Sequence, residues 1–496
     1  MSILVVEKVF FYKSILGYPL PTMPKSTVDS APNYILSLDV GTLSVRAALY
    51  DASGNLETMV SKPIHLNRLS ETEVEQNPIE MRDALFVVMN EVLAVASAEN
   101  KTIIAAGLTT QRSSIVAWNR KTGEPLSPIL SWQDRRAAAY LKLLASKGAK
   151  IKKKSGLFLT PYYGASKLRW LLDNCPPLLE ELDLIFGPLA AFIVHSIVES
   201  HPCIVDHVNA SRTQLMDLEA RDWSPALLQN FKLPSKLLPR CQPTQSYYGT
   251  LTGTEIPLTA VNGDQNAAIH GSGKVDEGTL IVNIGTGAFV LLSTGNRPIH
   301  HPRLLASIAN SNENSATYLL EGTVNSAGAA LNWASEQWNV SNLSEQLAGW
   351  LSEVENPPIF INTIGGLGSP HWTTGPATRF IGDGTLAEKA VAIAESIIFL
   401  IQINFEAMRN TGQVIKRIRI SGGLAALDNL CQLLADISKR AVVRSAETQS
   451  TARGIAWLAS NQSESWENQT EDFFLPKSNR PLQARYRKFC AELGWS

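Results

Sequence analysis

The stretch Leu38-Asp39-Val40-Gly41-Thr42 joins two largely apolar runs, residues 34–38 and 45–50. Short apolar runs on either side of a turn that contains glycine predict two β-strands connected by that turn. A similar stretch, Asn283-Ile284-Gly285-Thr286-Gly287, also lies between apolar runs, and Asn283 follows Asp39 by 244 residues. Because this spacing is about half of the 496 residues, it indicates two duplicated domains and not a solenoid, whose period is roughly 20–50 residues.

Helices are predicted in the intervals between strands. Residues 78–98 place apolar side chains at helical spacing, and further helices are expected at residues 135–146, 384–409 and 427–439. Strands that alternate with helices in both halves predict an α/β protein with two sheet-centred lobes. We expect four segments: an amino-terminal extension at 1–33, an amino-terminal lobe at 34–271, a carboxy-terminal lobe at 272–460 and a carboxy-terminal tail at 461–496.

The composition is that of a globular protein and excludes several classes of partner. Lys and Arg number 44 and Asp and Glu 45, so the net charge of −1 argues against nucleic acid or an anionic membrane surface. No apolar run approaches the ~18–20 residues of a membrane-spanning helix, so we expect no membrane insertion. The five cysteines are scattered without a C-x-x-C pair, which argues against a disulfide framework or a zinc site and favours the reducing cytoplasm.

The two repeated turns carry groups that can bind phosphate and a metal ion. Glycine lets the backbone bend tightly, so that N–H groups of the turn can point at phosphate oxygens. Thr42 and Ser44 add hydroxyl donors, and the carboxylate of Asp39 suits Mg²⁺ that is held through water molecules. One such turn is typical of an ordinary hairpin, whereas two superposable turns favour a site that holds both sides of one triphosphate.

Two further segments have a functional and a structural interpretation, and the local sequence leaves both open. Asp264, in Gly263-Asp264-Gln265-Asn266, can accept the proton of a substrate hydroxyl, or it can cap the helix that follows. Ser421-Gly422-Gly423 follows a predicted strand and can let an adenosine lie against the backbone, or it can be a helix entry made of small residues.

Arg112, Trp132 and Tyr162 are also candidates for a substrate site. Arg112 follows an apolar strand, and Trp132 lies just before Asp134, which can cap the next helix. Trp132 is therefore equally typical of a core tryptophan, and Tyr162 precedes a segment that can be one face of an amphipathic helix. Taken singly, these residues favour a structural role.

Three common enzyme classes are disfavoured by their motifs. Gly271-Ser272-Gly273-Lys274 resembles the end of a phosphate-binding P-loop, but Val275 stands where Ser or Thr is required. The turn at Gly285 lacks the third glycine of a dinucleotide-binding fingerprint and precedes a strand where that fold has a helix. No G-x-S-x-G nucleophile elbow of an α/β-hydrolase occurs.

Taken together, the segments resemble the FGGY carbohydrate kinases of the actin-like ATPase superfamily, and among them the glycerol kinases. The resemblance covers roughly residues 34–460, nearly the whole chain. It rests on the two repeated turns and on the segments at residues 109–112, 132–136, 161–164, 167–170, 209–213, 263–265, 321–324, 366–372, 421–423 and 451–459. It implies two duplicated actin-like (ribonuclease H-like) lobes with a nucleotide cleft between them.

The resemblance also implies a role for each matching residue in the ATP- and Mg²⁺-dependent phosphorylation of a small polyol or sugar. Asp264 is the general base, with Gln265 beside the substrate and Asp39 at the Mg²⁺. Arg112 and Tyr162 hydrogen-bond substrate hydroxyls, while Trp132 and Phe289 pack on its carbon chain. The residues expected at the ATP are Thr42, Ser44, Arg46, Thr286, Gly328, Asn332 and Gly423.

One departure from the family pattern bears on the substrate. Glycerol kinases have a glutamate directly after the Gln-Arg pair, and this chain has Ser113 there. Losing that carboxylate removes a charge-assisted hydrogen bond of about 1.5–3 kcal/mol, and the smaller side chain leaves room for a further hydroxymethyl group. Glycerol, a ketopentose or another polyol therefore stay open as substrates, and a non-catalytic nucleotide-binding protein is the alternative from another class.

A homodimer or a homotetramer is the expected assembly.

Overall fold

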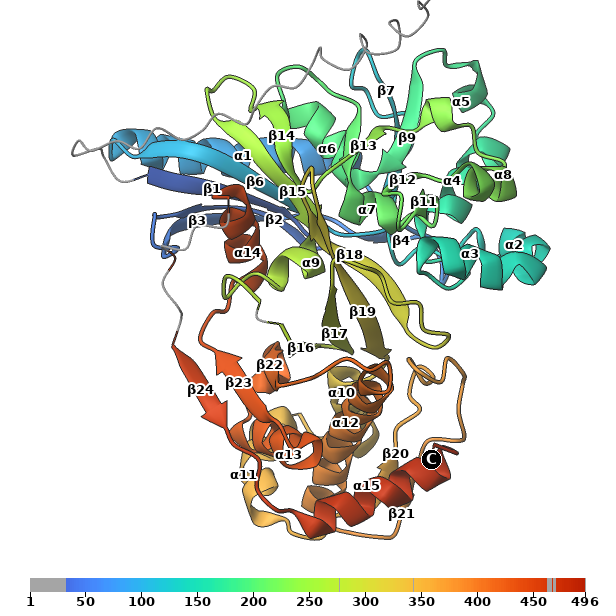
Figure 1. Ribbon diagram of the computed structural model, residues 1–496, viewed down its shortest axis with the longest axis vertical. Coiled ribbons are helices and arrows are strands. Elements are labelled where there is room, and N and C mark those ends of the chain that lie inside the picture. The colour runs from blue at the N-terminus through green and yellow to red at the C-terminus, as the bar shows by residue number, and fades with distance from the viewer. Residues whose placement is uncertain (1–32, 276, 342, 462–465, 467–469, 496) are drawn as a thin grey trace, which may run out of the picture.

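The computed structural model of the protein describes residues 33–275, 277–341, 343–461, 466 and 470–495. Two mixed β-sheets, one from each half of the chain, form the centres of two lobes, the upper and the lower body in Figure 1. The amino-terminal extension expected at 1–33 lies outside the described residues except for Asn33, as does most of the polar stretch at 461–468.

The amino-terminal lobe is built on a six-stranded sheet of order β14-β15-β6-β1-β2-β3. Its strands are β1 (Asn33–Val40), β2 (Ser44–Tyr50), β3 (Leu56–Pro63), β6 (Thr102–Thr110), β14 (Gln245–Thr250) and β15 (Pro257–Gly263). Strands β15, β6 and β1 run parallel, and β2 runs antiparallel to β1. Helices cover parallel strands on both faces, and accordingly every residue of β1 after Asn33 is buried.

The carboxy-terminal lobe repeats this arrangement in a seven-stranded sheet of order β18-β19-β17-β16-β22-β23-β24. Its strands are β16 (Thr279–Ile284), β17 (Ala288–Gly295), β18 (Leu305–Ser311), β19 (Ala316–Val324), β22 (Arg417–Ser421), β23 (Ala441–Ser445) and β24 (Glu471–Phe474). Strand β16 pairs antiparallel with β17 and parallel with β22, as β1 does with β2 and β6. Asp39 and Asn283 are each the penultimate residue of the first strand, which confirms the predicted duplication.

A smaller sheet of order β4-β5-β8-β7-β9 enlarges the amino-terminal lobe. It consists of β4 (Asn67–Arg68), β5 (Val74–Gln76), β7 (Ile115–Asn119), β8 (Ile129–Leu130) and β9 (Leu184–Pro188). The helices of this lobe are α1 (Pro78–Ala98), α2 (Ala138–Leu141), α3 (Gly148–Ser155), α4 (Gly164–Asn174), α5 (Pro177–Glu180), α6 (Leu189–Ile197), α7 (His207–Ser211), α8 (Pro225–Phe231) and α9 (Asp264–Ala268). Two-stranded sheets join β10 (Ile204–Asp206) to β13 (Arg240–Gln242) and β11 (Met216–Asp217) to β12 (Asp222–Trp223).

The remaining elements lie in the second half of the chain. They are α10 (Gly328–Trp338), α11 (Leu343–Glu353), α12 (Leu386–Arg409), α13 (Asp428–Ser438), α14 (Ser450–Ala459), α15 (Arg480–Glu492) and the pair β20 (Ile359–Ile361) and β21 (Arg379–Ile381). The helices predicted at 78–98, 384–409 and 427–439 are confirmed as α1, α12 and α13. The helix predicted at 135–146 is instead the short α2 followed by a 3₁₀-helix at Lys142–Lys147. Among the described residues, no helix has the length and apolarity required to cross a bilayer.

Helix α14 belongs to the second half of the chain in sequence but packs on the amino-terminal lobe in space, beside β1 and β2 in Figure 1. Its residue Ile455 shares a buried cluster with Ile35 and Ala260 of the first sheet. Gly454 permits the close approach, because a Cβ at this position would overlap the carbonyl of Ala267 in α9.

The β18–β19 hairpin also crosses between the lobes, since Ile308 and Tyr318 are buried in the core of the amino-terminal lobe. The expected boundary at residue 271 therefore divides the chain in sequence but not in its packing. Two later segments, α14 and this hairpin, pack against the first lobe. Apolar side chains on one face of each segment explain this, because they need a partner surface to be buried.

The described residues of the carboxy-terminal tail expected at 461–496 pack on the second lobe. Strand β24 pairs with β23 and extends the second sheet. Helix α15 buries Leu482, Tyr486, Phe489 and Cys490 in the core of the carboxy-terminal lobe. These four side chains are spaced at i, i+4, i+7 and i+8, the pattern of an amphipathic helix, so the tail is an integral part of that lobe.

Replacing Phe489 by alanine tests this integration. We expect the variant to lose about 3–5 kcal/mol of stability, because a fully buried phenylalanine leaves a cavity in the core of the lobe. Urea unfolding followed by circular dichroism measures the loss. The control is Phe473→Ala in β24, where the side chain is 61% exposed and the expected effect is small. Equal, small effects of the two substitutions would contradict an integral tail.

Candidate active site

The parallel register of three strands brings the predicted polar residues to one edge of the first sheet. Asp39 of β1 lies beside Thr109 of β6, and Thr109 lies beside Asn262 of β15. Arg112 and Asp264 follow the ends of β6 and β15 within two residues. Ligand sites of open α/β sheets form at the carboxyl ends of such strands, and the structure places these residues there.

Asp39 is a buried carboxylate that fits a cation. Its Oδ1 accepts a hydrogen bond of 2.8 Å from the Thr109 hydroxyl. The pKa of Asp39 is raised to about 6: burial is the largest cause and the charge of Asp264 acts in the same direction, while the hydrogen bond from Thr109 and the charge of Arg46 oppose them. A bound cation would favour the ionised form, and a single carboxylate with water and phosphate oxygens is a typical ligand set of Mg²⁺. No group of three or more His, Cys, Asp or Glu able to hold a metal occurs in the part of the chain that the structure describes.

Asp264 begins helix α9 and points toward a guanidinium group. Its Oδ1 lies 3.8 Å from Nε of Arg112 and accepts a hydrogen bond of 2.7 Å from the amide of Gln265. The residue at the N-cap position is Gly263, so Asp264 is not the helix cap that its sequence also allowed. Burial raises the pKa of Asp264 above the ordinary value, although Arg112 lowers it. A raised pKa makes this carboxylate a stronger proton acceptor.

Arg112 is held by several side chains at once. Its Nη1 donates a hydrogen bond of 2.7 Å to Oδ1 of Asn266, and its Nη2 donates to Oε1 of Gln265. Its Nη1 also lies 3.7 Å from the carboxylate of Glu321, which belongs to β19 in the second half of the chain. The guanidinium group is thereby fixed beside Asp264.

Glu321 joins two arginines of the first lobe to a strand of the second. Arg212 donates a hydrogen bond of 3.0 Å to Oε2 of Glu321, and the Ser307 hydroxyl donates to Oε1. Burial raises the pKa of Glu321, but Arg212 and Arg112 outweigh burial and hold it below the ordinary value. Glu321 and Arg212 lie in two of the segments that carry the family resemblance, but neither is among the site residues predicted from the sequence. A glutamate inside an otherwise largely apolar strand is the sequence signal that could have identified Glu321.

Trp132 and Tyr162 are large aromatic side chains left 41% and 44% exposed. The interpretation of Trp132 as a core tryptophan is therefore wrong. Its indole Nε1 donates a hydrogen bond of 3.0 Å to the Thr42 hydroxyl. Asp134 is structural but does not cap the next helix: it accepts hydrogen bonds from the amides of Val74 and Arg136, whereas the N-cap of α2 is Ala137. Exposed aromatic rings beside a polar edge can pack against the carbon chain of a small ligand.

Ser113 lies in the bend that follows Arg112. Its φ of 65° is a left-handed conformation that residues with a Cβ rarely adopt. Such strained residues cluster at ligand sites, and this bend turns the chain away from β6 directly after Arg112. The structure thus joins Arg112, Ser113, Trp132, Asp264 and Gln265 to Asp39 at a single edge of the first sheet.

The first repeated turn contributes Thr42, Ser44 and Arg46. The hydroxyl of Thr42 donates its one proton to Oε1 of Gln111 at 3.0 Å. This hydrogen bond must break before the hydroxyl can donate to a phosphate. The carbonyl of Ser44 accepts a hydrogen bond from Gly41 that closes the turn. Arg46 lies 3.4 Å from Gln449, which immediately precedes α14.

The second repeated turn is bound to the start of α10. The amides of Ala327 and Ala329 donate to the carbonyl of Thr286, and the amide of Gly328 donates to the carbonyl of Gly285. Thr286 is exposed, as is Asn332 one turn further along α10. The three amides at the start of α10 are engaged by carbonyls of the turn, so the exposed Thr286 is the group of this turn that is open to a phosphate.

Gly422 and Gly423 lie beside the same turn at the end of β22. Gly422 has a φ of 94°, and a Cβ there would overlap the carbonyl of Ile284. Asn283 donates a hydrogen bond of 3.0 Å to the hydroxyl of Ser421. A Cβ on Gly423 would meet no atom within 4 Å, so the backbone here borders open space in which a flat group can lie.

Phe289 lies on β17 and is paired with Asn283 of β16 and Thr323 of β19. Paired residues, and residues two apart on a strand, share a face of the sheet. Phe289 and Thr323 therefore share a face with Glu321, whose carboxylate approaches Arg112 of the other lobe. This face is turned toward the polar edge of the first sheet.

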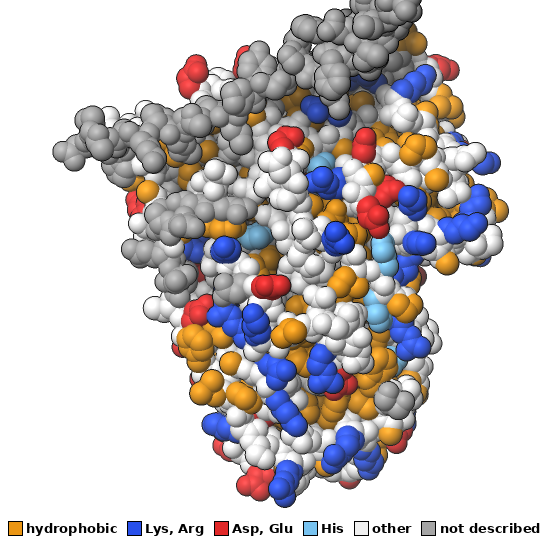
Figure 2. Space-filling view, viewed as in Figure 1, with side chains coloured by type: hydrophobic (Ala, Val, Ile, Leu, Met, Phe, Trp, Pro, Cys, Tyr) orange, Lys and Arg blue, Asp and Glu red, His pale blue; other side chains and the backbone are white. Residues whose placement is uncertain are grey.

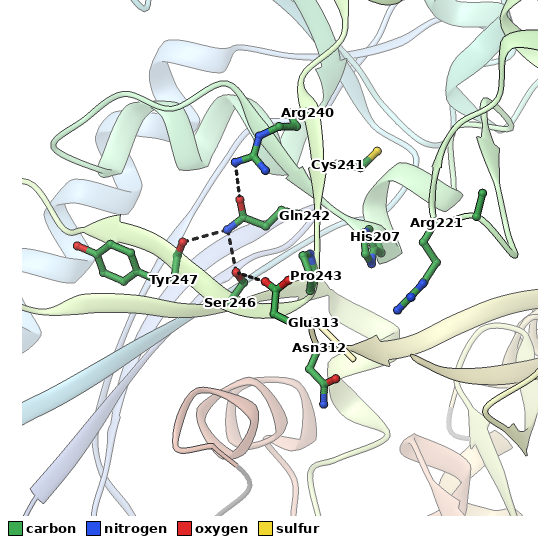
Figure 3. A pocket seen from close by; sticks show the side chains of 11 residues that line it. His207, Arg221, Arg240, Cys241, Gln242, Pro243, Ser246, Tyr247, Asn312 and Glu313 are labelled. Carbon is green, nitrogen blue, oxygen red and sulfur yellow. Dashed lines mark hydrogen bonds between the residues drawn. The ribbon is translucent and has the colours of Figure 1, made fainter. Parts of the chain in front are cut away.

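A separate hollow lies between the tip of the β18–β19 hairpin and the first lobe (Figure 3), with a cavity volume of about 550 Å³. Arg240 donates to Gln242, which in turn donates to Ser246 and to the carbonyl of Tyr247. None of the predicted site residues lines this hollow, so the candidate active site is at the strand ends and not here.

Replacing Glu321 by glutamine tests the ionic connection between the lobes. We expect a loss of about 3–5 kcal/mol of stability, because Arg112 and Arg212 are left buried without their carboxylate. Thermal unfolding measures the change. Glu313→Gln, at the exposed tip of the same hairpin, is the control and should leave the midpoint almost unchanged. Equal midpoints for both variants would show that Glu321 does not connect the lobes.

Comparison with known proteins agrees with this geometry. The model of the amino-terminal domain of the FGGY family of carbohydrate kinases matches residues 34–271, and the model of the carboxy-terminal domain matches residues 280–462. Glycerol kinase of Shewanella amazonensis is 32% identical over 93% of this chain and 97% of its own, and that of Thermococcus kodakarensis is 33% identical over 93% and 98%.

Solved structures show the same two-lobed fold. Plasmodium falciparum glycerol kinase with ADP has a TM-score of 0.87 at 25% identity and covers 94% of this chain and 97% of its own. A xylulose kinase from Lactobacillus acidophilus has a TM-score of 0.82 at 21% identity over 92% and 97%. The enzyme transfers a phosphoryl group from ATP, with Mg²⁺, to an alcohol group of a small polyol or sugar. The chain belongs to the FGGY family of carbohydrate kinases.

Proposed function

We propose that the substrate is glycerol and that the enzyme transfers the γ-phosphoryl group of ATP to a primary hydroxyl, which gives glycerol 3-phosphate. The observation that carries this proposal is the approach of Asp264 to Arg112, 3.8 Å apart, at the sheet edge where the exposed Trp132 is hydrogen-bonded to Thr42. A base, a cationic hydrogen-bond donor and an aromatic surface are together the groups that a small polyol requires. The relatives named glycerol kinase support this choice of substrate.

Asp264 acts as the general base in this proposal. Its carboxylate accepts the proton of the attacking hydroxyl while the bond from that oxygen to the γ-phosphorus forms and the bond to the β-phosphate oxygen breaks, so that ADP leaves. Arg112 keeps the carboxylate oriented and donates to a second hydroxyl of the substrate. Most of the rate acceleration comes from alignment of the two substrates, since phosphoryl transfer requires little covalent chemistry of the protein.

The nucleotide lies between the two repeated turns. Asp39 would hold Mg²⁺, and the ion would neutralise phosphate charge. The turns at Gly41 and Gly285 hold the phosphates from the two sides, with Thr42, Ser44 and Arg46 on one side and Thr286, Gly328 and Asn332 on the other. Gly423 borders the open surface for adenosine. Gln265, Tyr162 and Phe289 complete the polyol site.

A ketopentose or another longer polyol is the second candidate substrate. Ser113 favours it, because a serine occupies less space than the glutamate of the glycerol kinase pattern and leaves room for a further hydroxymethyl group. The choice between the two substrates depends on the residue that directly follows Arg112. A substitution of Ser113 therefore tests that choice.

We also propose that the enzyme works in the cytoplasm as a homodimer or homotetramer. The absence of disulfides supports the compartment, since Cys175, Cys203, Cys241, Cys431 and Cys490 are all free. Both signs of charge are interspersed on each lobe on the face shown in Figure 2, which is typical of a surface without a polyanionic partner. Light scattering of the purified protein measures the mass of the assembly.

Asp264→Asn separates the chemistry from nucleotide binding. We expect turnover with glycerol to fall by about 10²–10⁴-fold, because the amide cannot accept the proton, while the thermal shift produced by ATP is retained. A coupled assay of ADP release measures turnover. Near-normal turnover by this variant would remove Asp264 from the role of base.

Ser113→Glu tests which polyol the site selects. If the enzyme acts on glycerol without this carboxylate, restoring it should add a charge-assisted bond of about 1.5–3 kcal/mol, a roughly 10- to 100-fold lower KM for glycerol. Ser113→Ala is the matched control and should leave that KM unchanged, since no hydrogen bond of the serine hydroxyl is required. A wild-type preference for ribulose or xylulose over glycerol, lost in Ser113→Glu, would support the second candidate instead.

A further inference from the structure

Lys167 is a fully buried lysine in the first turn of α4. Its Nζ donates three hydrogen bonds, all to backbone carbonyls: 2.6 Å to Ser131, 3.0 Å to Tyr162 and 3.3 Å to Ser113. An ammonium group has three N–H donors, so this set of acceptors satisfies all of them. These carbonyl dipoles hold the charge by direct hydrogen bonds, and the carboxylate of Asp134 also favours it.

The three carbonyls belong to the three segments that carry the proposed polyol contacts. Ser113 directly follows Arg112, Ser131 directly precedes Trp132, and Tyr162 is itself a proposed contact. The side chain of Ser114 adds a further connection, because its hydroxyl accepts a hydrogen bond of 2.9 Å from the amide of Trp132. One ammonium group therefore connects segments that are up to 49 residues apart in sequence.

The position of Lys167 is unfavourable for stability alone. The start of a helix carries a partial positive charge, which repels a cation in the first turn. Burial lowers the pKa of Lys167 to about 7, and Arg136 lowers it as well, while Asp134 is the neighbour that raises it. A lysine is almost never fully buried without a charged partner. Packing alone thus gives no reason for an ammonium group here, whereas the three carbonyls do.

We propose that Lys167 is a positioning residue that fixes the polyol side of the active site by holding Arg112, Trp132 and Tyr162 at their relative places. The inference rests on the proposed function, because it takes these three residues as the polyol contacts. In the part of the chain that the structure describes, Lys167 exchanges no hydrogen bond with either nucleotide turn, and it is linked to the first turn only indirectly, through the bond that Trp132 donates to Thr42. Loss of the ammonium group should therefore weaken the recognition of the polyol much more than that of ATP.

Lys167→Met removes the three donors and keeps the length of the side chain. We expect kcat/KM for the polyol to fall by about 10²-fold, mainly through KM, since small displacements of binding groups have effects of this size. The KM for ATP and the thermal shift produced by ATP should change much less, since Lys167 is linked to the first nucleotide turn only through Trp132 and Thr42. A merely structural role would lower the amount of folded enzyme and leave both KM values alone.

Lys152→Met is the matched control. Lys152 also donates to two backbone carbonyls, those of His301 and Leu304, but neither belongs to a proposed polyol contact. We expect this variant to keep the wild-type KM for the polyol. Lys167→Gln, which retains two donors, should have a KM between those of the wild type and Lys167→Met, and it serves if Lys167→Met does not fold.

The outcomes distinguish this inference from the proposed function. If the wild type phosphorylates neither glycerol nor the pentoses, the proposed function fails before Lys167 is tested. If the wild type is active and the folded Lys167 variants keep its KM for the polyol, the positioning role is overturned. Equal increases of the polyol KM in Lys152→Met and Lys167→Met would overturn it as well.

Discussion

The parallel alignment of β15, β6 and β1 is the constraint on which the rest of the active site depends. It places Asp39, Arg112 and Asp264, which are far apart in sequence, at one edge of one sheet. The duplication then supplies a second turn of the same form at the end of β16. This geometry suits the proposed site for two substrates, because one sheet edge holds the carboxylates and the second turn repeats the first on the other lobe.

Opposite charges in the interior make this arrangement possible. Asp264 and Glu321 are each compensated by arginine, and Arg112 is near both. Burial lowers the pKa of Arg112 to about 10, so it stays charged at neutral pH. The network also crosses from one lobe to the other through Glu321 of β19, so the place of Arg112 depends on how the lobes meet.

Much of the fold follows from the sequence. The two strand–turn–strand units, the α/β class and the helices at 78–98, 384–409 and 427–439 are all visible as local patterns, and the structure has them. Less predictable is where a segment packs. The apolar face of α14 does not say which lobe covers it, and α15 follows a polar stretch that suggested a tail. These placements depend on contacts distant in sequence, which periodicity does not encode.

The active site likewise contains some residues that the sequence predicts and others that it does not. Asp39, Asp264 and Arg112 follow strands directly and were therefore recognisable, whereas Glu321 and Lys167 act through other residues. A buried glutamate or lysine is evident only when its partners are known, and those of Lys167 are backbone carbonyls, which leave no mark in the sequence. The roles of the predicted site residues remain proposals, and their positions support them.

A crystal structure with Mg²⁺, a non-hydrolysable ATP analogue and glycerol tests the central claim most directly. The account predicts that the phosphates contact the turns at Gly41 and Gly285 at the same time. It also predicts a glycerol hydroxyl within about 2.6–3.2 Å of the Asp264 carboxylate. Phosphates that contact only one of the two turns, or a polyol bound away from Asp264, would contradict it.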